Sequence, residues 1–180
     1  QREIGLDVLD FEIGMKHAVR EDPDVMLVGE MRDKETFMTA IHAAETGLLV
    51  FGTLHTNNAA KTVDRIISVF PASEQEGIRN VLGETLRAVV AQQLIPKVGG
   101  GRVAAIEILF SSPAIGNMIR EGKTPQITSA IQTGSKEGMI DMDSSIRKLY
   151  DEKKISARAA LDKAIDKAQF KDLAEGGGGA

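Results

Sequence analysis

The chain has 180 residues, of which 42% are hydrophobic and 27% charged, and its formal net charge at pH 7 is −4. This length suits one domain, or one domain with a small appendage. Its 22 basic and 26 acidic side chains are mixed along the sequence, and aromatic residues make up 4%. Nucleic-acid binding needs a basic surface and usually stacking platforms, so we expect no nucleic-acid partner.

Cysteine is absent from the sequence, which excludes disulfides and thiolate zinc sites and fits a reducing cytosol. The apolar runs have only the length of strands, so we expect a water-soluble domain that does not insert into a membrane. The chain begins at Gln1 instead of methionine. We expect it to be part of a longer protein.

The N-terminal third alternates helical and strand patterns. Helical spacing over residues 11–20 leads into an apolar run over residues 25–28, which predicts a central parallel strand covered on both faces. Residues 34–46 again have helical spacing and end at Gly47, a good C-terminal cap, before a second apolar run over residues 49–54. Strand, helix and strand predict a βαβ unit with parallel strands.

A reactive polar side chain follows each of these strands, Glu30 after the first and His55 after the second. The carboxyl ends of parallel strands meet at one edge of a sheet, where ligands bind, so we expect both side chains to point into the same crevice. A carboxylate there is suited to hold Mg²⁺ or a metal-bound water beside a nucleotide. The alternative, a solvated loop residue after each strand, stays open.

Longer segments carry a resemblance to a known family. EDPDVMLVGEMRD, residues 21–33, resembles the Walker B box of the secretion ATPases that drive type IV pili and type II secretion. LLVFGTLHTNNAAKTVDRI, residues 48–66, resembles their histidine box. Shorter motifs resemble the pilus-retraction branch of the family, the PilT-type ATPases, and extend the resemblance from residue 1 to about residue 142: QREIGLD, AAETG, VFP, GGGRVAAIEIL and SAIQTG.

The resemblance implies an ATP-hydrolysing motor subunit that powers type IV pilus retraction and twitching motility, with ATP and Mg²⁺ as cofactors. It also implies a homohexamer that lies in the cytoplasm at the inner membrane and works on the pilus platform protein there. The implied fold is α/β. Residues 1–111 would form part of a RecA-like P-loop ATPase core with parallel central strands, residues 112–172 a small all-helical C-terminal subdomain, and residues 173–180 a flexible Gly-rich tail.

The same resemblance assigns roles to site residues. Glu30 would hold Mg²⁺ or its water, and His55 would contact the γ-phosphate, which makes them the candidate catalytic pair. Arg32 and Arg65 are candidate cations at the phosphates or between subunits, with surface salt bridges as the open alternative. Thr56 is a further candidate at the nucleotide, with shaping of the strand end as its alternative.

The sequence contains no G-x-x-x-x-G-K-[ST] phosphate loop. In the family this loop and an acidic box lie upstream of the segment that corresponds to Gln1. We therefore expect the chain alone to lack ATPase activity.

The rest of the sequence predicts mainly helices. Asn58 is placed to cap a helix from Ala59 to about Val69, and Ser73 with Glu76 predicts a long helix that runs to about Leu94. The glycines at 99–101 predict a hairpin or a tight loop before a strand over residues 102–110. Further helices are expected over residues 113–121, 125–132, 143–152 and 156–170.

Two features bear on the direction of the motor. Extension and secretion relatives commonly carry a four-cysteine zinc motif before the strand at residues 102–110, and its absence favours the retraction branch. Residues 114–121, AIGNMIRE, resemble the signature helix of that branch, with Gly116 where the branch has arginine. We expect the apolar face formed by Ile115, Met118 and Ile119 to dock this helix, and Gly116→Arg to be tolerated.

Alternative functions remain open. One is a pilus-extension or type II secretion ATPase of the same family. Another is a non-catalytic accessory ring subunit. A nucleic-acid motor on the same core is a third alternative, although the acidic charge balance counts against it.

Overall fold

The computed structural model describes residue 3 and residues 5–176 and has the predicted α/β class. The chain forms two compact units. The first holds Gln1–His55, Val63–Leu86 and Gly116–Lys123, and the second holds Thr56–Thr62, Arg87–Ile115 and Thr124–Ala180. The elements of the described residues follow in chain order: α1 (Phe11–Val19), β1 (Val25–Val28), α2 (Lys34–Glu45), β2 (Leu49–Gly52), α3 (Ala59–Ser68), α4 (Ala72–Thr85), β3 (Ala88–Pro96), β4 (Arg102–Phe110), α5 (Pro113–Arg120), η1 (Thr124–Gln126), α6 (Ile127–Thr133), η2 (Gly134–Glu137), α7 (Met142–Asp151), α8 (Ala157–Lys163) and α9 (Ala168–Gly176).

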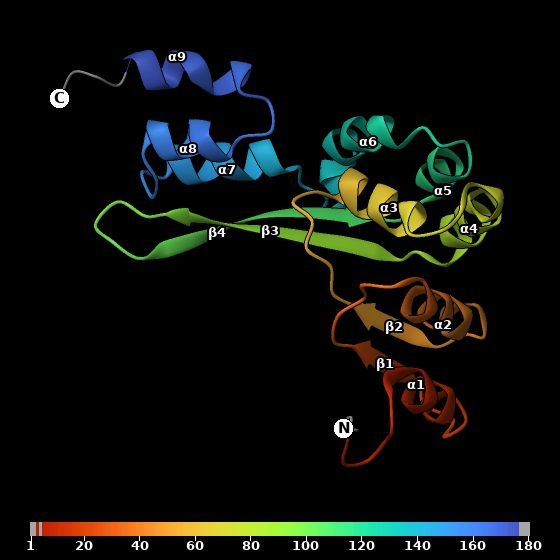
Figure 1. The fold of residues 1–180 in the computed structure, drawn as a ribbon. Helices are drawn as coiled ribbons and strands as arrows, with labels where there is room; N and C mark the ends of the chain where they lie inside the picture. Colours follow the sequence, from red (N-terminus) through yellow and green to blue (C-terminus); the bar gives the residue numbers. More distant parts are fainter. Residues whose placement is uncertain (1–2, 4, 177–180) are drawn as a thin grey trace. The chain divides into compact units, whose positions relative to one another are not determined.

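The first unit contains the predicted βαβ arrangement. Strands β1 and β2 pair in parallel, with Val25 opposite Leu49, and α2 connects them. Helices α1 and α2 lie on one side of the two strands (Figure 1). The small core between helices and strands consists of Met15, Met26, Val28, Ala40 and Ala43.

The prediction that β1 is covered on both faces is wrong for the described chain. Val25 and Leu27 are 53% and 73% exposed, and their partners Leu49 and Phe51 on β2 are 45% and 52% exposed. Side chains alternate between the faces of a sheet, so these four lie opposite the face that α1 and α2 cover. An apolar run alone does not show whether a second layer lies on that face.

Helices α4 and α5 meet through two glycines. Gly116 of α5 is buried, and a Cβ built on it would lie 2.5 Å from the carbonyl oxygen of Gly83 in α4. Ile115 and Ile119 are buried at 1% and 0% exposure, as their spacing predicts. The expectation that Gly116→Arg is tolerated is wrong, because backbone atoms occupy the space beside Gly116.

The second unit is built on an antiparallel hairpin, of which the sequence predicted the loop and β4 but not β3. The expected helix to Leu94 ends at Thr85, and β3 pairs with β4 from Ala88–Phe110 to Pro96–Arg102. The glycines 99–101 have φ values of 85°, 101° and 76°, as the predicted tight loop requires. The apolar residues of β3 fit a helical stripe as well as a strand, and the pairing with β4 decides between the two.

Helices α7 and α8 lie on one face of this hairpin, and α9 lies over α8 (Figure 1). The predicted helix over residues 156–170 is wrong, because the chain forms two helices with a turn between them. The carboxylate of Asp143 accepts the N–H groups of Ile165 and Asp166 in that turn, each at 2.8 Å. The core of the unit is contributed by the hairpin and these helices: Ala91, Ile95, Ala105, Met142, Ile146, Leu149, Ile155, Ala160, Ala164 and Phe170.

The predicted division between residues 111 and 112 differs from the division into compact units, because the hairpin shares its core with the C-terminal helices. These domain boundaries therefore stay a prediction. The predicted tail from residue 173 overlaps α9, which continues to Gly176, so that part is wrong. Residues 177–180 lie outside the described residues. Among the described helices, none has the length and apolar character needed to cross a bilayer.

Candidate nucleotide site

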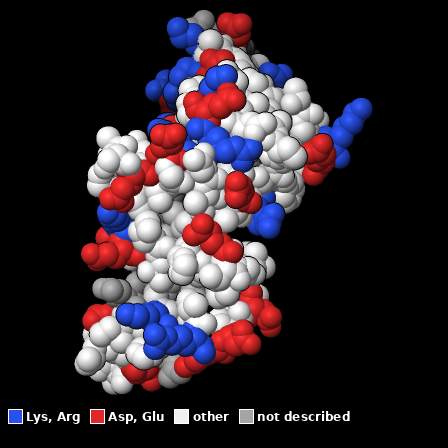
Figure 2. Space-filling view, turned by 90° about the vertical axis from the view of Figure 1, so that its right-hand side faces the viewer, with Lys and Arg blue, Asp and Glu red and all other residues white. Residues whose placement is uncertain are grey.

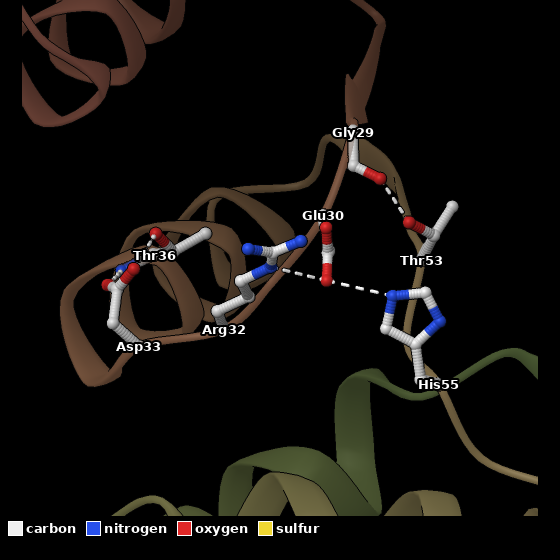
Figure 3. Close-up of polar contacts among 7 residues, drawn as sticks. All are labelled: Gly29, Glu30, Arg32, Asp33, Thr36, Thr53 and His55. Atoms are coloured by element: carbon white, nitrogen blue, oxygen red, sulfur yellow. Dashed lines mark hydrogen bonds and ion pairs between the residues drawn. The ribbon is translucent and has the colours of Figure 1, made fainter.

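Backbone contacts tie together the segments that follow β1 and β2. The N–H of Met31 donates to the carbonyl of Thr53 at 3.2 Å, and the Thr53 hydroxyl donates to the carbonyl of Gly29 (Figure 3). The parallel pairing therefore continues beyond the strand ends. Glu30 and His55 lie within these two tied segments, so their relative position is fixed by the sheet.

The Glu30 carboxylate lies between two nitrogen groups (Figure 3). Its Oε1 is 2.9 Å from Nε2 of His55 and 2.5 Å from Nε of Arg32. The Glu30 side chain is 28% exposed, whereas those of His55 and Arg32 are 85% and 75% exposed. The expectation that Glu30 and His55 meet at the ends of their strands is confirmed, and their catalytic roles stay a prediction.

The charge state of Glu30 determines which ring nitrogen of His55 carries a hydrogen. The hydrogen bond from Arg32 lowers the pKa of Glu30 against the opposing effect of burial, and His55 lowers the pKa further. Glu30 is thus ionised at neutral pH, and an ionised carboxylate only accepts hydrogen bonds. Nε2 of His55 must therefore carry the hydrogen, which leaves Nδ1 as an acceptor in the neutral ring and as a donor in the protonated ring.

Asp33, the nearest acidic residue along the chain, has a structural role. Its carboxylate accepts the backbone N–H of Thr36 at 2.9 Å and the Thr36 hydroxyl at 3.1 Å, and so caps the start of α2 (Figure 3). The Thr36 N–H bond lowers the pKa of Asp33. Asp33 therefore fixes the start of α2 directly after Arg32. Its carboxylate is used as a helix cap, and the carboxylate that contacts His55 is that of Glu30.

The side chains around Glu30 limit the kind of metal site that it can form. Within the described part of the chain, no cluster of three or more His, Cys, Asp or Glu residues could hold a metal ion. Oε1 of Glu30 already accepts from two groups. Mg²⁺ in nucleotide sites commonly takes one or two carboxylates and completes its shell with phosphates and water. The residues present fit an Mg²⁺ held chiefly by nucleotide phosphates.

The other predicted site residues, Thr56 and Arg65, have different surroundings. The Thr56 hydroxyl is 2.7 Å from the hydroxyl of Thr62 at the start of α3, which supports a role in shaping this segment. Arg65 is exposed in the last turn of α3. Among the described residues, no hydrogen bond or ion pair connects Arg65 with Glu30, Arg32 or His55, so its predicted role stays a prediction.

Glu107 of β4 is a residue that the sequence analysis missed. It is 2% exposed, and its two carboxylate oxygens accept the N–H groups of Ala59 at 2.6 Å and Met142 at 3.0 Å. Burial raises the pKa of Glu107 against the effect of these two bonds, and the nearby Asp141 and Asp143 raise it further. The signal in the sequence is an acid in strand phase with Ala105 and Leu109, which are core residues.

Charges of both signs are mixed over the visible face of the molecule (Figure 2). Lys and Arg side chains lie among Asp and Glu side chains, and this face carries no broad area of a single sign. The mixture agrees with the charge balance of −4. A surface of this kind does not attract a polyanion over a wide area.

Comparison with known proteins identifies the family. Residues 5–105 match the family described as type II/IV secretion system protein, and the chain belongs to this family. It is 54% identical over 164 residues to the type IV pilus retraction ATPase PilT of Pseudomonas aeruginosa, which covers 91% of this chain and 48% of that protein. It is 53% identical over 165 residues to the twitching motility protein of Neisseria gonorrhoeae, which covers 91% of this chain and 44% of that protein.

A solved structure agrees with the sequence matches. The crystal structure of the pilus retraction motor PilT with bound ADP superposes with a TM-score of 0.85 and 46% identity, over 94% of this chain and 48% of that chain. This likeness confirms the α/β fold of the secretion ATPases. The chain spans about half the length of the relatives that it matches.

Proposed function

We propose that this chain is the C-terminal part of an ATPase subunit that powers type IV pilus retraction and thereby twitching motility. The observation that carries the proposal is the contact of Glu30 with His55 and Arg32 at the carboxyl ends of two parallel strands. In open α/β sheets this edge is where nucleotides bind. Membership of the secretion family and the 54% identity to a retraction ATPase favour retraction over extension.

Glu30, His55 and Arg32 would each make a different contact at the nucleotide. Glu30 presents the negative charge that Mg²⁺ or a metal-bound water requires, and it holds the ring of His55 through Nε2. Nδ1 of His55 is then the ring nitrogen left for a phosphate oxygen, to which it donates only in the protonated ring. Arg32 is 75% exposed and is free to pair with a phosphate instead of Glu30.

An Mg²⁺ bound with the nucleotide would neutralise charge on the phosphates. Phosphoryl transfer depends mainly on positioning and on stabilisation of developing charge, which are the contributions that Glu30 and His55 can make. The phosphate loop is outside the 180 residues, because no such motif occurs in them. The complete site is therefore expected to include residues from the other half of the full-length protein.

The assembly belongs to the same proposal. By family membership we expect a homohexameric ring that works at the cytoplasmic face of the inner membrane, against the pilus platform protein. The mixed surface charge in Figure 2 supports a protein partner over a nucleic acid.

The test is complementation of a bacterial strain that lacks its retraction ATPase. The full-length protein should restore surface motility and return the number of pili per cell to normal, and the Glu30→Gln form should do neither. Restored motility with unchanged pilus number would point to an accessory role. A strain that stays immotile and gains pili when the unmodified protein is present would favour the extension ATPase.

A further inference from the structure

The carboxylate of Glu107 joins the starts of two helices that are far apart in the sequence. Its Oε1 lies 2.6 Å from the N–H of Ala59, the first residue of α3, and its Oε2 lies 3.0 Å from the N–H of Met142, the first residue of α7. Helices leave their first N–H groups without partners inside the helix, and these groups attract negative charge. One buried carboxylate therefore accepts one of these N–H groups from each helix. A relative movement of the two helix starts would break one of the two hydrogen bonds.

On the α3 side, the connection continues to Thr56, the residue after His55. Oδ1 of Asn58 caps the helix by accepting the N–H of Lys61 at 2.8 Å. The hydroxyl of Thr62 donates to the Asn58 carbonyl at 2.8 Å and lies 2.7 Å from the hydroxyl of Thr56. Because Thr56 directly follows His55 in the chain, the start of α3 fixes the segment beside the candidate nucleotide site.

The α7 side leads to the C-terminal helices. Asp141 caps α7 by accepting the N–H of Ser144 at 3.1 Å. Asp143 is 9% exposed, and it accepts the N–H groups of Ile165 and Asp166, each at 2.8 Å, in the turn between α8 and α9. The start of α7 therefore orients the helices that follow it.

A buried carboxylate costs desolvation free energy that an apolar side chain at the same position would avoid. The carboxylate compensates for this cost by directional hydrogen bonds that fix the starts of two helices. We propose that Glu107 is a positioning residue that couples the segment after His55 to helices α7–α9, so that a shift of Thr56 on nucleotide binding is transmitted to these helices. The transmission rests on the proposed function, whereas the connection between the two helices does not.

Hydrogen exchange of the full-length protein tests the connection without nucleotide. Glu107→Gln keeps one acceptor oxygen and replaces the other by an NH₂ group that cannot accept. We expect exchange at the start of α3, of α7, or of both to become about tenfold faster, the loss of one hydrogen bond worth about 1.4 kcal/mol. Glu137→Gln is the control, because Glu137 is exposed in the same unit. Unchanged exchange at both helix starts would overturn the proposal.

The same measurement with a non-hydrolysable ATP analogue tests the transmission. We expect the analogue to alter exchange in residues 53–58 and 142–146 of the unmodified protein, and Glu107→Gln to lose the second response while it keeps the first. A retained response in α7, or no α7 response in unmodified protein that binds the analogue, would overturn the coupling. If the unmodified protein binds no analogue, the proposed function fails, and the exchange without nucleotide alone decides the role of Glu107.

A second variant keeps the test valid if Glu107→Gln does not fold. Thr62→Val retains the side-chain shape but removes the hydroxyl that contacts Thr56. It interrupts the same connection one step nearer the nucleotide, so the α7 response to the analogue should again be lost. A response equal to that of the unmodified protein would count against the coupling in the same way.

Discussion

The backbone of Gly116 in α5 lies directly against the backbone of Gly83 in α4. A Cβ on Gly116 would be 2.5 Å from the Gly83 carbonyl oxygen, and a Cβ on Gly83 would be 2.8 Å from the Gly116 carbonyl oxygen. Both distances are shorter than any normal carbon–oxygen contact. The two helices therefore meet through their main chains. Gly116 is the position at which the signature helix of the retraction branch, which residues 114–121 resemble, has arginine.

Gly116→Ala is expected to destabilise the full-length protein by about 1–3 kcal/mol, because the new methyl group forces α4 and α5 apart. Gly77→Ala is the matched control on α4. A Cβ at Gly77 meets no atom within 4 Å, so alanine there should stabilise by about 0.5–1 kcal/mol through its higher helix propensity. Urea denaturation measures both changes. Equal effects at the two positions would show that the helices do not meet at Gly116.

Ile119→Asp should prevent stable docking of α5. Ile119 is 0% exposed, so the variant buries a carboxylate and loses apolar contacts, and we expect a loss of about 4 kcal/mol or more. Asn117→Asp adds the same charge to an exposed position of the same helix, where Asn117 already accepts from Arg120. Melting temperature and surface motility should fall sharply for Ile119→Asp and change little for Asn117→Asp. Similar behaviour of the two variants would contradict the buried position of Ile119.

The raised pKa of Glu107 predicts how the stability of the protein changes with pH. Burial raises its pKa in the folded protein, so the folded state binds the proton more tightly than the unfolded state does. The contribution of Glu107 is then fully present below the ordinary glutamate pKa and is lost as the pH rises through the raised value. Glutamine does not titrate. The difference in unfolding free energy between the unmodified protein and Glu107→Gln should therefore shrink as the pH rises from about 4 to 8.

Urea unfolding at a series of pH values measures this difference. Glu137→Gln serves as the control, because Glu137 is exposed and its replacement should give a difference without this trend. A difference for Glu107→Gln that grows with pH would mean that the two N–H bonds outweigh burial and that the pKa of Glu107 is lowered.

The 180-residue chain by itself should hydrolyse no appreciable ATP, because its sequence has no phosphate loop to bind the nucleotide. Phosphate release by the purified chain with Mg-ATP measures this directly. Turnover at the rate of an ordinary motor, abolished by Glu30→Gln, would show that the nucleotide site is complete within these residues.

The contact between Glu30 and His55 was predictable from the sequence, whereas strand β3 in the second half of the fold was not. Glu30 and His55 could be placed together because each follows an apolar strand and a helix of suitable length connects the two. The contact of Arg32 with Glu30 could not be placed, since a surface salt bridge and a role at a phosphate have the same sequence pattern.

The hairpin β3–β4 shows why other predictions were wrong. Leu86, Val89 and Val90 continue the apolar stripe of α4, so local periodicity favoured a longer helix. Only the long-range pairing with β4 and the core beneath it favour a strand, and neither is visible in a local window. The role of Glu107 is likewise set by two helix starts that are 83 residues apart in sequence (142 minus 59).

The central claim is that Glu30 and His55 act on a bound nucleotide. ATP hydrolysis by the full-length protein tests it with two variants, Glu30→Gln and His55→Ala, and two matched controls, Glu35→Gln and His42→Ala, which change exposed residues of α2. We expect Glu30→Gln to lower kcat by about 100-fold and His55→Ala by at least about tenfold, with KM changed by less than about threefold, because both residues act on charge that develops during the reaction. The controls should keep the rate of the unmodified protein. If both site variants hydrolyse ATP at that rate as well, Glu30 and His55 only stabilise the ends of their strands and the account is wrong.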